Sequence, residues 1–146
     1  CELAQKHLVS QESSSLSSLR EHFYKLISNQ ISGVEIFGDL ENRLPNTLNL
    51  GFDEVEGDTL LIGLDMAGVA VSTGSACSSG SGLPSPVLTA MGIPLDKINS
   101  SIRFSFGWGN TLAEVEEAAK VLEETVLLNR VGFSKEMNNK KLMKSL

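Results

Sequence analysis

The chain has 146 residues, of which 41% are hydrophobic, and its formal net charge is -6. This length can bury the core of one domain without disulfides or a structural metal. The acidic balance disfavours nucleic acid as a partner, and neither a membrane-spanning apolar run nor a signal peptide is evident, so we expect a cytoplasmic protein.

Two cysteines occur, Cys1 and Cys77, and neither belongs to a Cys-x-x-Cys pair. We expect both to be free thiols in a reducing compartment. The first residue is Cys1 rather than methionine, which indicates a processed, cleaved or truncated product.

The first predicted elements are a helix and two strands. Apolar residues recur at steps of three and four ahead of Gly33, which indicates an amphipathic helix that ends near this glycine. Residues 34–37 and 47–52 are predicted to form short strands. The second strand alternates, and three apolar residues should share its buried face, namely Leu48, Leu50 and Phe52.

The middle of the chain changes from helix to strand to loop. The leucine spacing between residues 56 and 66 predicts a short helix, and residues 68–71 are predicted to form a buried strand. Residues 72–82 have no hydrophobic period and consist almost wholly of glycine, serine, threonine and alanine, which is typical of a loop. A brief helix should follow over residues 87–92.

Residues 101–106 alternate again and predict a strand. Three apolar residues should point inward, namely Ile102, Phe104 and Phe106, with Arg103 on the opposite face. Thr111 and Glu114 have the spacing of a capping box at the start of the last long helix. The lysine-rich end is predicted to be a solvated tail.

The order of these elements predicts an α+β fold, in which helices cover a small, mostly antiparallel sheet. We divide the chain into a leading helix (residues 1–32), a small domain (33–130) and a flexible basic tail (131–146). No internal repeat is visible.

Cys77 is the candidate nucleophile. It lies in a polar loop where a thiol has little to pack against, so we expect it to be exposed. An accessible thiol without a use is an oxidation liability. A buried structural cysteine is the alternative for an arbitrary sequence, but this loop does not favour it.

Several reaction classes are disfavoured at Cys77. No arginine follows it within the loop, as a cysteine phosphatase or rhodanese would need, and no lysine follows the glycines as in a phosphate-binding loop. The two histidines lie in or near the first helix and are more simply surface residues than partners of a papain-like thiolate: His7 and His22.

Arg103 is the second candidate. Its planar fork of donors suits a carboxylate, whereas the simpler interpretation is a surface arginine paired with a glutamate. Asn46 and Asn49 are interpreted as structural residues at a strand entrance. We predict no metal site.

Three stretches together resemble the cysteine desulfurases of the NifS and IscS type. They are Val71-Ser72-Thr73-Gly74-Ser75-Ala76-Cys77-Ser78-Ser79, Pro84-Ser85-Pro86-Val87-Leu88 and Ser101-Ile102-Arg103-Phe104-Ser105-Phe106-Gly107. Four shorter segments resemble the family as well, namely Pro45-Asn46-Thr47-Leu48-Asn49, Glu56-Gly57, Asn110-Thr111 and Glu114-Val115. The resemblance extends from about residue 15 to residue 130.

The resemblance implies an enzyme that uses pyridoxal 5'-phosphate to convert L-cysteine into L-alanine and a persulfide. Cys77 would carry the persulfide on a mobile loop, where it could contact an iron–sulfur cluster transiently, and Arg103 would hold the substrate carboxylate. The family further implies a homodimer and an iron–sulfur scaffold or another sulfur acceptor as the partner. The fold would be that of the C-terminal domain of fold-type I pyridoxal-phosphate enzymes.

The chain is much shorter than members of this family, and none of its eight lysines lies in the family's lysine motif. The cofactor should therefore be bound mainly by a missing N-terminal domain, and we expect this chain alone to be inactive. The alternatives are a free-standing sulfur carrier or scaffold-binding module, and an inert remnant.

Overall fold

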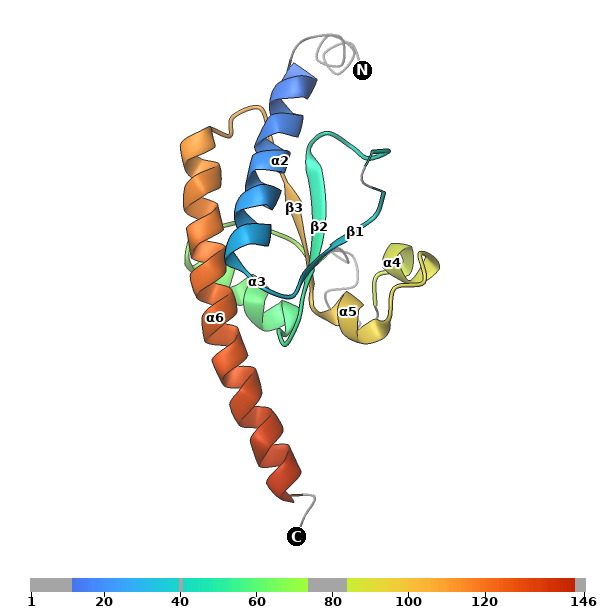
Figure 1. The fold of residues 1–146 in the computed structure, drawn as a ribbon, viewed down its shortest axis with the longest axis vertical. Helices are drawn as coiled ribbons and strands as arrows, with labels where there is room; N and C mark the ends of the chain where they lie inside the picture. The colour runs from blue at the N-terminus through green and yellow to red at the C-terminus, as the bar shows by residue number, and fades with distance from the viewer. Residues whose placement is uncertain (1–11, 40, 74–83, 144–146) are drawn as a thin grey trace.

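The computed structural model describes residues 12–39, 41–73 and 84–143. Within these residues the strands form one antiparallel sheet in the order β1-β2-β3, flanked by helices (Figure 1). The α+β class is confirmed. The elements are α2 (Glu12–Gln30), β1 (Val34–Phe37), β2 (Thr47–Phe52), α3 (Gly57–Met66), α4 (Pro86–Ala90), α5 (Leu95–Asn99), β3 (Ser101–Ser105) and α6 (Leu112–Met143).

The register of the sheet follows the alternation of the sequence. Leu48 pairs with Phe104 and Leu50 with Ile102, so one face of β2 and β3 is apolar. The predicted inward residues of both strands are all buried: Leu48, Leu50, Phe52, Ile102, Phe104 and Phe106. The bounds predicted for β1 and β2 are those of the structure.

The main core lies between this apolar face and helices α2, α3 and α6. Helices α2 and α6 lie side by side along the sheet (Figure 1), and α3 packs against α6 and β3. Phe23 of α2 contacts both Phe104 and Phe106, with ring centroids 4.9 Å and 5.6 Å away. The predicted helix before Gly33 therefore contributes to the core as expected.

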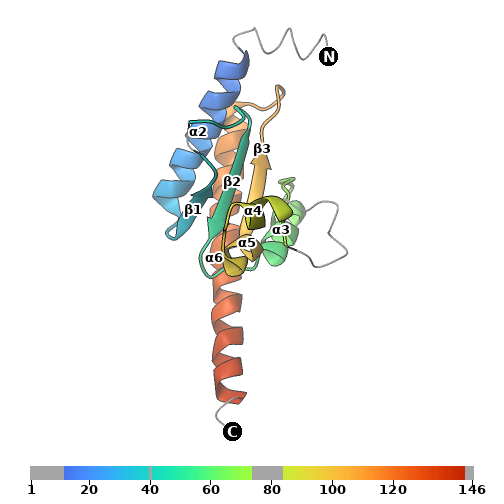
Figure 2. The ribbon, with the colours of Figure 1, turned by 90° about the vertical axis from the view of Figure 1, so that its right-hand side faces the viewer.

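A smaller cluster lies on the other face of the sheet, where α4 and α5 pack (Figure 2). It is built from Phe37 of β1, Leu88 of α4 and Ile98 of α5. The Phe37 ring lies over Gly51, which leaves no room for a side chain there. These two short helices thus cover only part of the outer face.

The segment 68–71 is not a strand, and that prediction was wrong. The Val69 N–H donates to the Leu64 carbonyl over 2.8 Å and closes the end of α3, so it is unavailable to a sheet. Gly68 has a φ of 84°, which turns the chain out of α3. Ser72 alone forms a bridge, with Arg103 of β3.

Helix α5 was not predicted, because one turn is too short to show a period.

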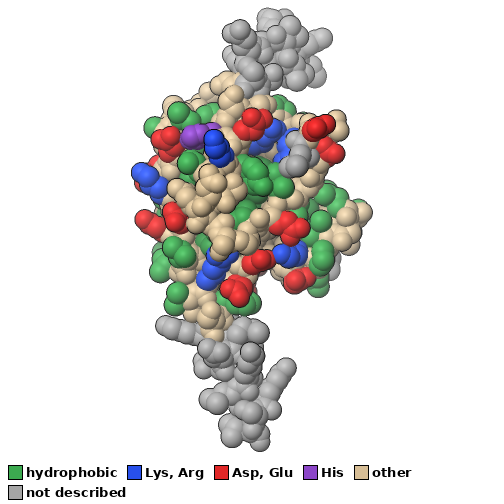
Figure 3. Space-filling model, in the orientation of Figure 1, with side chains coloured by type: hydrophobic (Ala, Val, Ile, Leu, Met, Phe, Trp, Pro, Cys, Tyr) green, Lys and Arg blue, Asp and Glu red, His purple; other side chains and the backbone are tan. Residues whose placement is uncertain are grey.

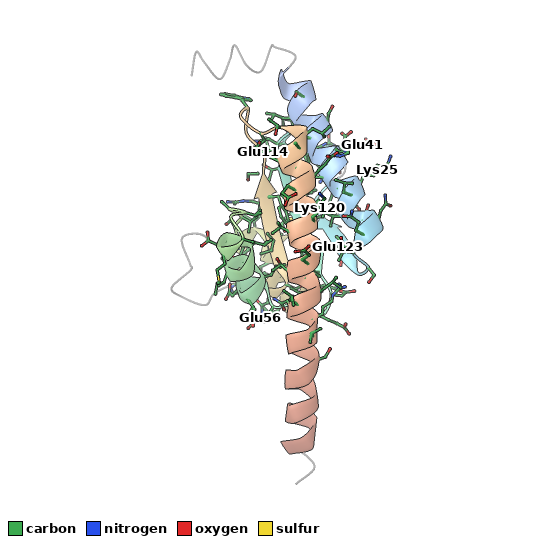
Figure 4. All side chains as sticks on the ribbon, turned by 90° about the vertical axis from the view of Figure 1, so that its left-hand side faces the viewer. Lys25, Glu41, Glu56, Glu114, Lys120 and Glu123 are labelled. Atoms are coloured by element: carbon green, nitrogen blue, oxygen red, sulfur yellow. The ribbon has the colours of Figure 1, made fainter. Side chains whose placement is uncertain are left out.

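Helix α6 begins with the predicted capping box, in which Glu114 lies in the first turn of the helix (Figure 4). The Thr111 N–H donates to Oε2 of Glu114 over 2.7 Å, and the Glu114 N–H donates to Oγ1 of Thr111 over 3.3 Å. The helix continues past Gly132 to Met143 and extends beyond the sheet (Figure 1). The backbone of residues 131–143 is therefore helical. The division into three segments and the flexibility of the tail stay predictions.

Charged side chains of both signs are interspersed on the face shown in Figure 3. Among the described residues, the helices offer no stretch that is long and apolar enough to cross a membrane.

We expect Gly51→Ala to destabilise the protein by about 1–3 kcal/mol, because a Cβ at this position would come within 2.6 Å of Cζ of the buried Phe37 ring. Gly109→Ala is the matched control, since no atom lies within 4 Å of a Cβ built there. Its effect should stay within about 0.5 kcal/mol. Urea unfolding of both variants measures the difference, and equal stabilities would contradict the Phe37–Gly51 packing.

The capping box should make stability depend on pH. The pKa of Glu114 is lowered below its ordinary value, first by the backbone N–H of Thr111 and then by its hydroxyl. A depressed folded pKa gives stability that is present at neutral pH and is lost as the pH falls through that pKa. Glu114→Gln should therefore lower the unfolding midpoint at pH 7 and approach the parent at acid pH. The exposed Glu124→Gln should show no such convergence.

Candidate functional site

The candidate site is a row of residues across the outer face of the sheet. Phe37 of β1 pairs with Asn49 of β2, Asn49 pairs with Arg103 of β3, and Arg103 pairs with Ser72. Residues directly opposite each other in antiparallel strands point to the same face. The side chains of Asn49, Arg103 and Ser72 therefore share one face, away from the main core.

The Ser72–Arg103 bridge connects Arg103 to a residue five positions before Cys77. Its two hydrogen bonds run from the Ser72 N–H to the Arg103 carbonyl, over 3.1 Å, and from the Arg103 N–H to the Ser72 carbonyl, over 2.6 Å. Cys77 lies outside the described residues. It follows Ser72 by five residues, so covalent geometry holds its Cα within about 18 Å of that of Ser72. The base of the Cys77 loop is thus fixed beside Arg103.

Arg103 is half-buried, and its guanidinium makes no hydrogen bond or ion pair with another described residue. Some other cations in the described part of the chain have acidic partners, whereas Arg43 and Arg130 bond to backbone carbonyls. Lys97 contacts Asp53 and Glu35, and Arg20 contacts Glu21. The simpler interpretation of Arg103, a surface arginine paired with a glutamate, therefore finds no support here. Its donors are available for an anion.

The environments of Asn46 and Asn49 differ, although the sequence analysis interpreted both as structural residues. The Asn46 side chain donates to the Phe106 carbonyl over 3.3 Å, as a structural residue would. The Oδ1 atom of Asn49 is buried and lacks a hydrogen-bond partner among the described residues. Such an atom costs about 1–3 kcal/mol of desolvation. The sequence analysis interpreted Asn49 as structural, and its outward position in an alternating strand was the signal that could have marked it as a candidate for the site.

The lysines with described side chains do not form a pyridoxal-phosphate site. Lys97 lies in a hollow that is lined by Asp53, Glu54, Glu56 and Asp96, where a phosphate group would be repelled. Its hydrogen bond to Asp53, and then that to Glu35, raises the pKa of Lys97. It therefore stays protonated, whereas an amine that attacks an aldehyde must be neutral.

Lys25 and Lys120 do not offer an enclosed site either. Lys25 is exposed on α2, and Lys120 projects from α6 beside Glu117 (Figure 4). The described residues thus do not fit the cofactor. They also contain no group of three or more histidine, cysteine or acidic side chains that could hold a metal.

A groove that is larger than the hollow around Lys97 lies between β3, α6 and residues 67–71. Its cavity of about 580 Å³ is lined by residues 67–71, by Phe104 and Phe106, and by α6. Glu114 and Glu117 contribute carboxylates to it, which disfavours an acidic ligand. Arg103 does not line it. The groove and the Arg103 row are therefore separate features.

Comparison with known proteins gives a consistent result. A model of the Aminotransferase class-V family matches residues 2–118. IscS 1 of Bacillus subtilis is 57% identical over 93 residues, which cover 63% of this chain and 24% of that protein. "Cysteine desulfurase IscS" of Dictyoglomus turgidum is 43% identical over 111 residues, or 76% of this chain and 28% of the relative.

Solved structures show the same likeness. A protein described as "NIFS-LIKE PROTEIN" superimposes with a TM-score of 0.73 and 31% identity, over 87% of this chain and 31% of its own. A NifS-like protein from Rickettsia africae gives a TM-score of 0.68 at 29% identity, over 80% of this chain and 29% of its own. The chain thus spans about a quarter to a third of the length of these relatives.

The family model covers most of the chain, and the relatives that match it carry the name cysteine desulfurase. The resemblance found in the sequence is confirmed. The chain belongs to the class-V aminotransferase family and is a homologue of the cysteine desulfurases of the IscS and NifS type.

Proposed function

We propose that this chain is the small C-terminal domain of a cysteine desulfurase, which carries the sulfur-accepting thiol and the substrate-carboxylate ligand of the complete enzyme. The Ser72–Arg103 bridge carries the proposal, because it joins the base of the Cys77 loop to an arginine without an acidic partner in the described residues. The names of the relatives favour a desulfurase over a free-standing sulfur carrier.

In this proposal Arg103 binds the carboxylate of L-cysteine through two parallel N–H···O bonds. The Cys77 thiolate attacks the substrate sulfur, the carbon–sulfur bond breaks and a sulfur–sulfur bond forms. The carbon takes up a proton, so L-cysteine and the Cys77 thiol become L-alanine and the Cys77 persulfide. The substrate carbon is reduced and the two sulfurs are oxidised, without an external oxidant.

The remaining parts of the enzyme lie outside this chain in our proposal. The part that the chain lacks binds pyridoxal 5'-phosphate, which the family uses to stabilise charge on the substrate carbon. The complete enzyme forms a homodimer in the cytoplasm and passes sulfur to an iron–sulfur scaffold or another acceptor protein. This division follows from the absence of a cofactor-like lysine environment among the described side chains.

The role of Cys77 predicts where sulfur accumulates. When the full-length protein is incubated with L-cysteine and then alkylated, mass spectrometry should find one additional sulfur atom on Cys77. Cys77→Ser should abolish both this adduct and L-alanine formation, because a hydroxyl is a poor nucleophile towards sulfur. Cys1→Ser is the matched control and should retain both. A persulfide on Cys1, or L-alanine formation by Cys77→Ser, would contradict the assignment.

The role of Arg103 predicts a defect in binding. Arg103→Lys keeps the charge but loses the two-pronged geometry, so KM for L-cysteine in the full-length enzyme should rise by at least about tenfold. The unfolding midpoint should change little, because the guanidinium has no ion pair or hydrogen bond with the described residues. An unchanged KM would refute the carboxylate role.

A further inference from the structure

Asn49 and Arg103 occupy opposite positions in β2 and β3. Both backbone groups of Arg103 bond to Ser72, so they point away from β2. Asn49 and Arg103 therefore form the kind of antiparallel pair that exchanges no backbone bonds, in which the Cα atoms approach to about 4.5 Å and the side chains lie closest. Their side chains are immediate neighbours on the outer face.

The two side chains are also chemically complementary. Asn49 presents a buried amide oxygen without a partner among the described residues, and Arg103 carries five N–H donors and no acceptor. The other neighbour of Asn49 in the row is Phe37, whose ring offers no donor. Of the two residues that neighbour Asn49 in the row, Arg103 is therefore the one whose side chain offers a donor to this oxygen.

We propose that Asn49 is a positioning residue for Arg103, an inference that rests on the proposed function. The amide oxygen accepts one guanidinium N–H when the substrate carboxylate binds, and it fixes the plane of the fork so that two other N–H groups meet the carboxylate. A neutral amide suits this task. A carboxylate at the same position would itself pair with Arg103 and compete with the substrate.

Kinetics of the full-length enzyme test this role with L-cysteine as substrate and L-alanine as competing product. Asn49→Ala should raise KM for L-cysteine and the inhibition constant of L-alanine about tenfold, while kcat changes less than about twofold. Asn49→Asp should raise both constants further. Thr47→Ala is the matched control, because Thr47 lies on the same face of β2 opposite Ser105, and it should leave both constants unchanged.

The unfolding midpoint of the Asn49→Ala variant distinguishes a positioning role of Asn49 from a structural role. Because the Asn49 oxygen has no partner within the described residues, Asn49→Ala should leave the unfolding midpoint unchanged or raise it. A lower midpoint with unchanged KM would identify Asn49 as structural and overturn the inference.

A double mutant separates this inference from the proposed function. In the Arg103→Lys background, adding Asn49→Ala should change KM by less than about twofold, because the two residues act as one unit. Full additivity of the two effects would refute the inference and leave the carboxylate role of Arg103 intact. If Arg103→Lys alone has no effect on KM, the proposed function itself fails.

Discussion

The register in which β2 pairs with β3 decides on which side of the sheet each side chain lies. Leu48 and Leu50 face Phe104 and Ile102 across one face, and all four are buried. A slip of β3 by one residue would expose Phe104 and Ile102 and bury Arg103, which the hydrophobic effect opposes strongly. The packing of the main core therefore holds Asn49 and Arg103 opposite each other on the outer face.

The outer face is shared between packing and the candidate site. Phe37, Leu88 and Ile98 cover the part near β1, and the missing side chain of Gly51 leaves room for the tip of the Phe37 ring. Arg103 lies at the other side, where Ser72 continues the row by a single bridge. Helices α4 and α5 thus hold the chain that follows residue 83 against the outer face of the sheet.

Much of the fold could be predicted from the sequence, because the alternation in β2 and β3 and the threonine–glutamate capping box are strong local signals. The segment 68–71 was mispredicted, since its apolar residues resemble a strand while its N–H groups close helix α3. Helix α5 is too short to show a period. Here tertiary packing and a helix end override the local pattern.

The candidate site was only partly predictable. Arg103 stood out through its position opposite the apolar face of its strand, and Cys77 through the glycine and serine residues around it, although Cys77 lies outside the described residues. The sequence analysis did not separate Asn49 from Asn46, and the hydrogen bonding that distinguishes the two is visible only in the structure. The bridge between Ser72 and Arg103 joins residues 31 positions apart, and no local pattern indicates it.

Cys77 lies in the sequence between two residues that the fold holds in place, namely Ser72, through its bridge, and the buried Ser85, whose hydroxyl caps α4 through the Leu88 N–H. A thiol held within about 18 Å of Ser72 is confined to a small volume. That volume corresponds to a local thiol concentration on the order of tens of millimolar or more, whatever the concentration of the enzyme. In the proposed reaction, sulfur capture is therefore intramolecular in its kinetics, and only the later transfer to an acceptor depends on how many partner molecules are present.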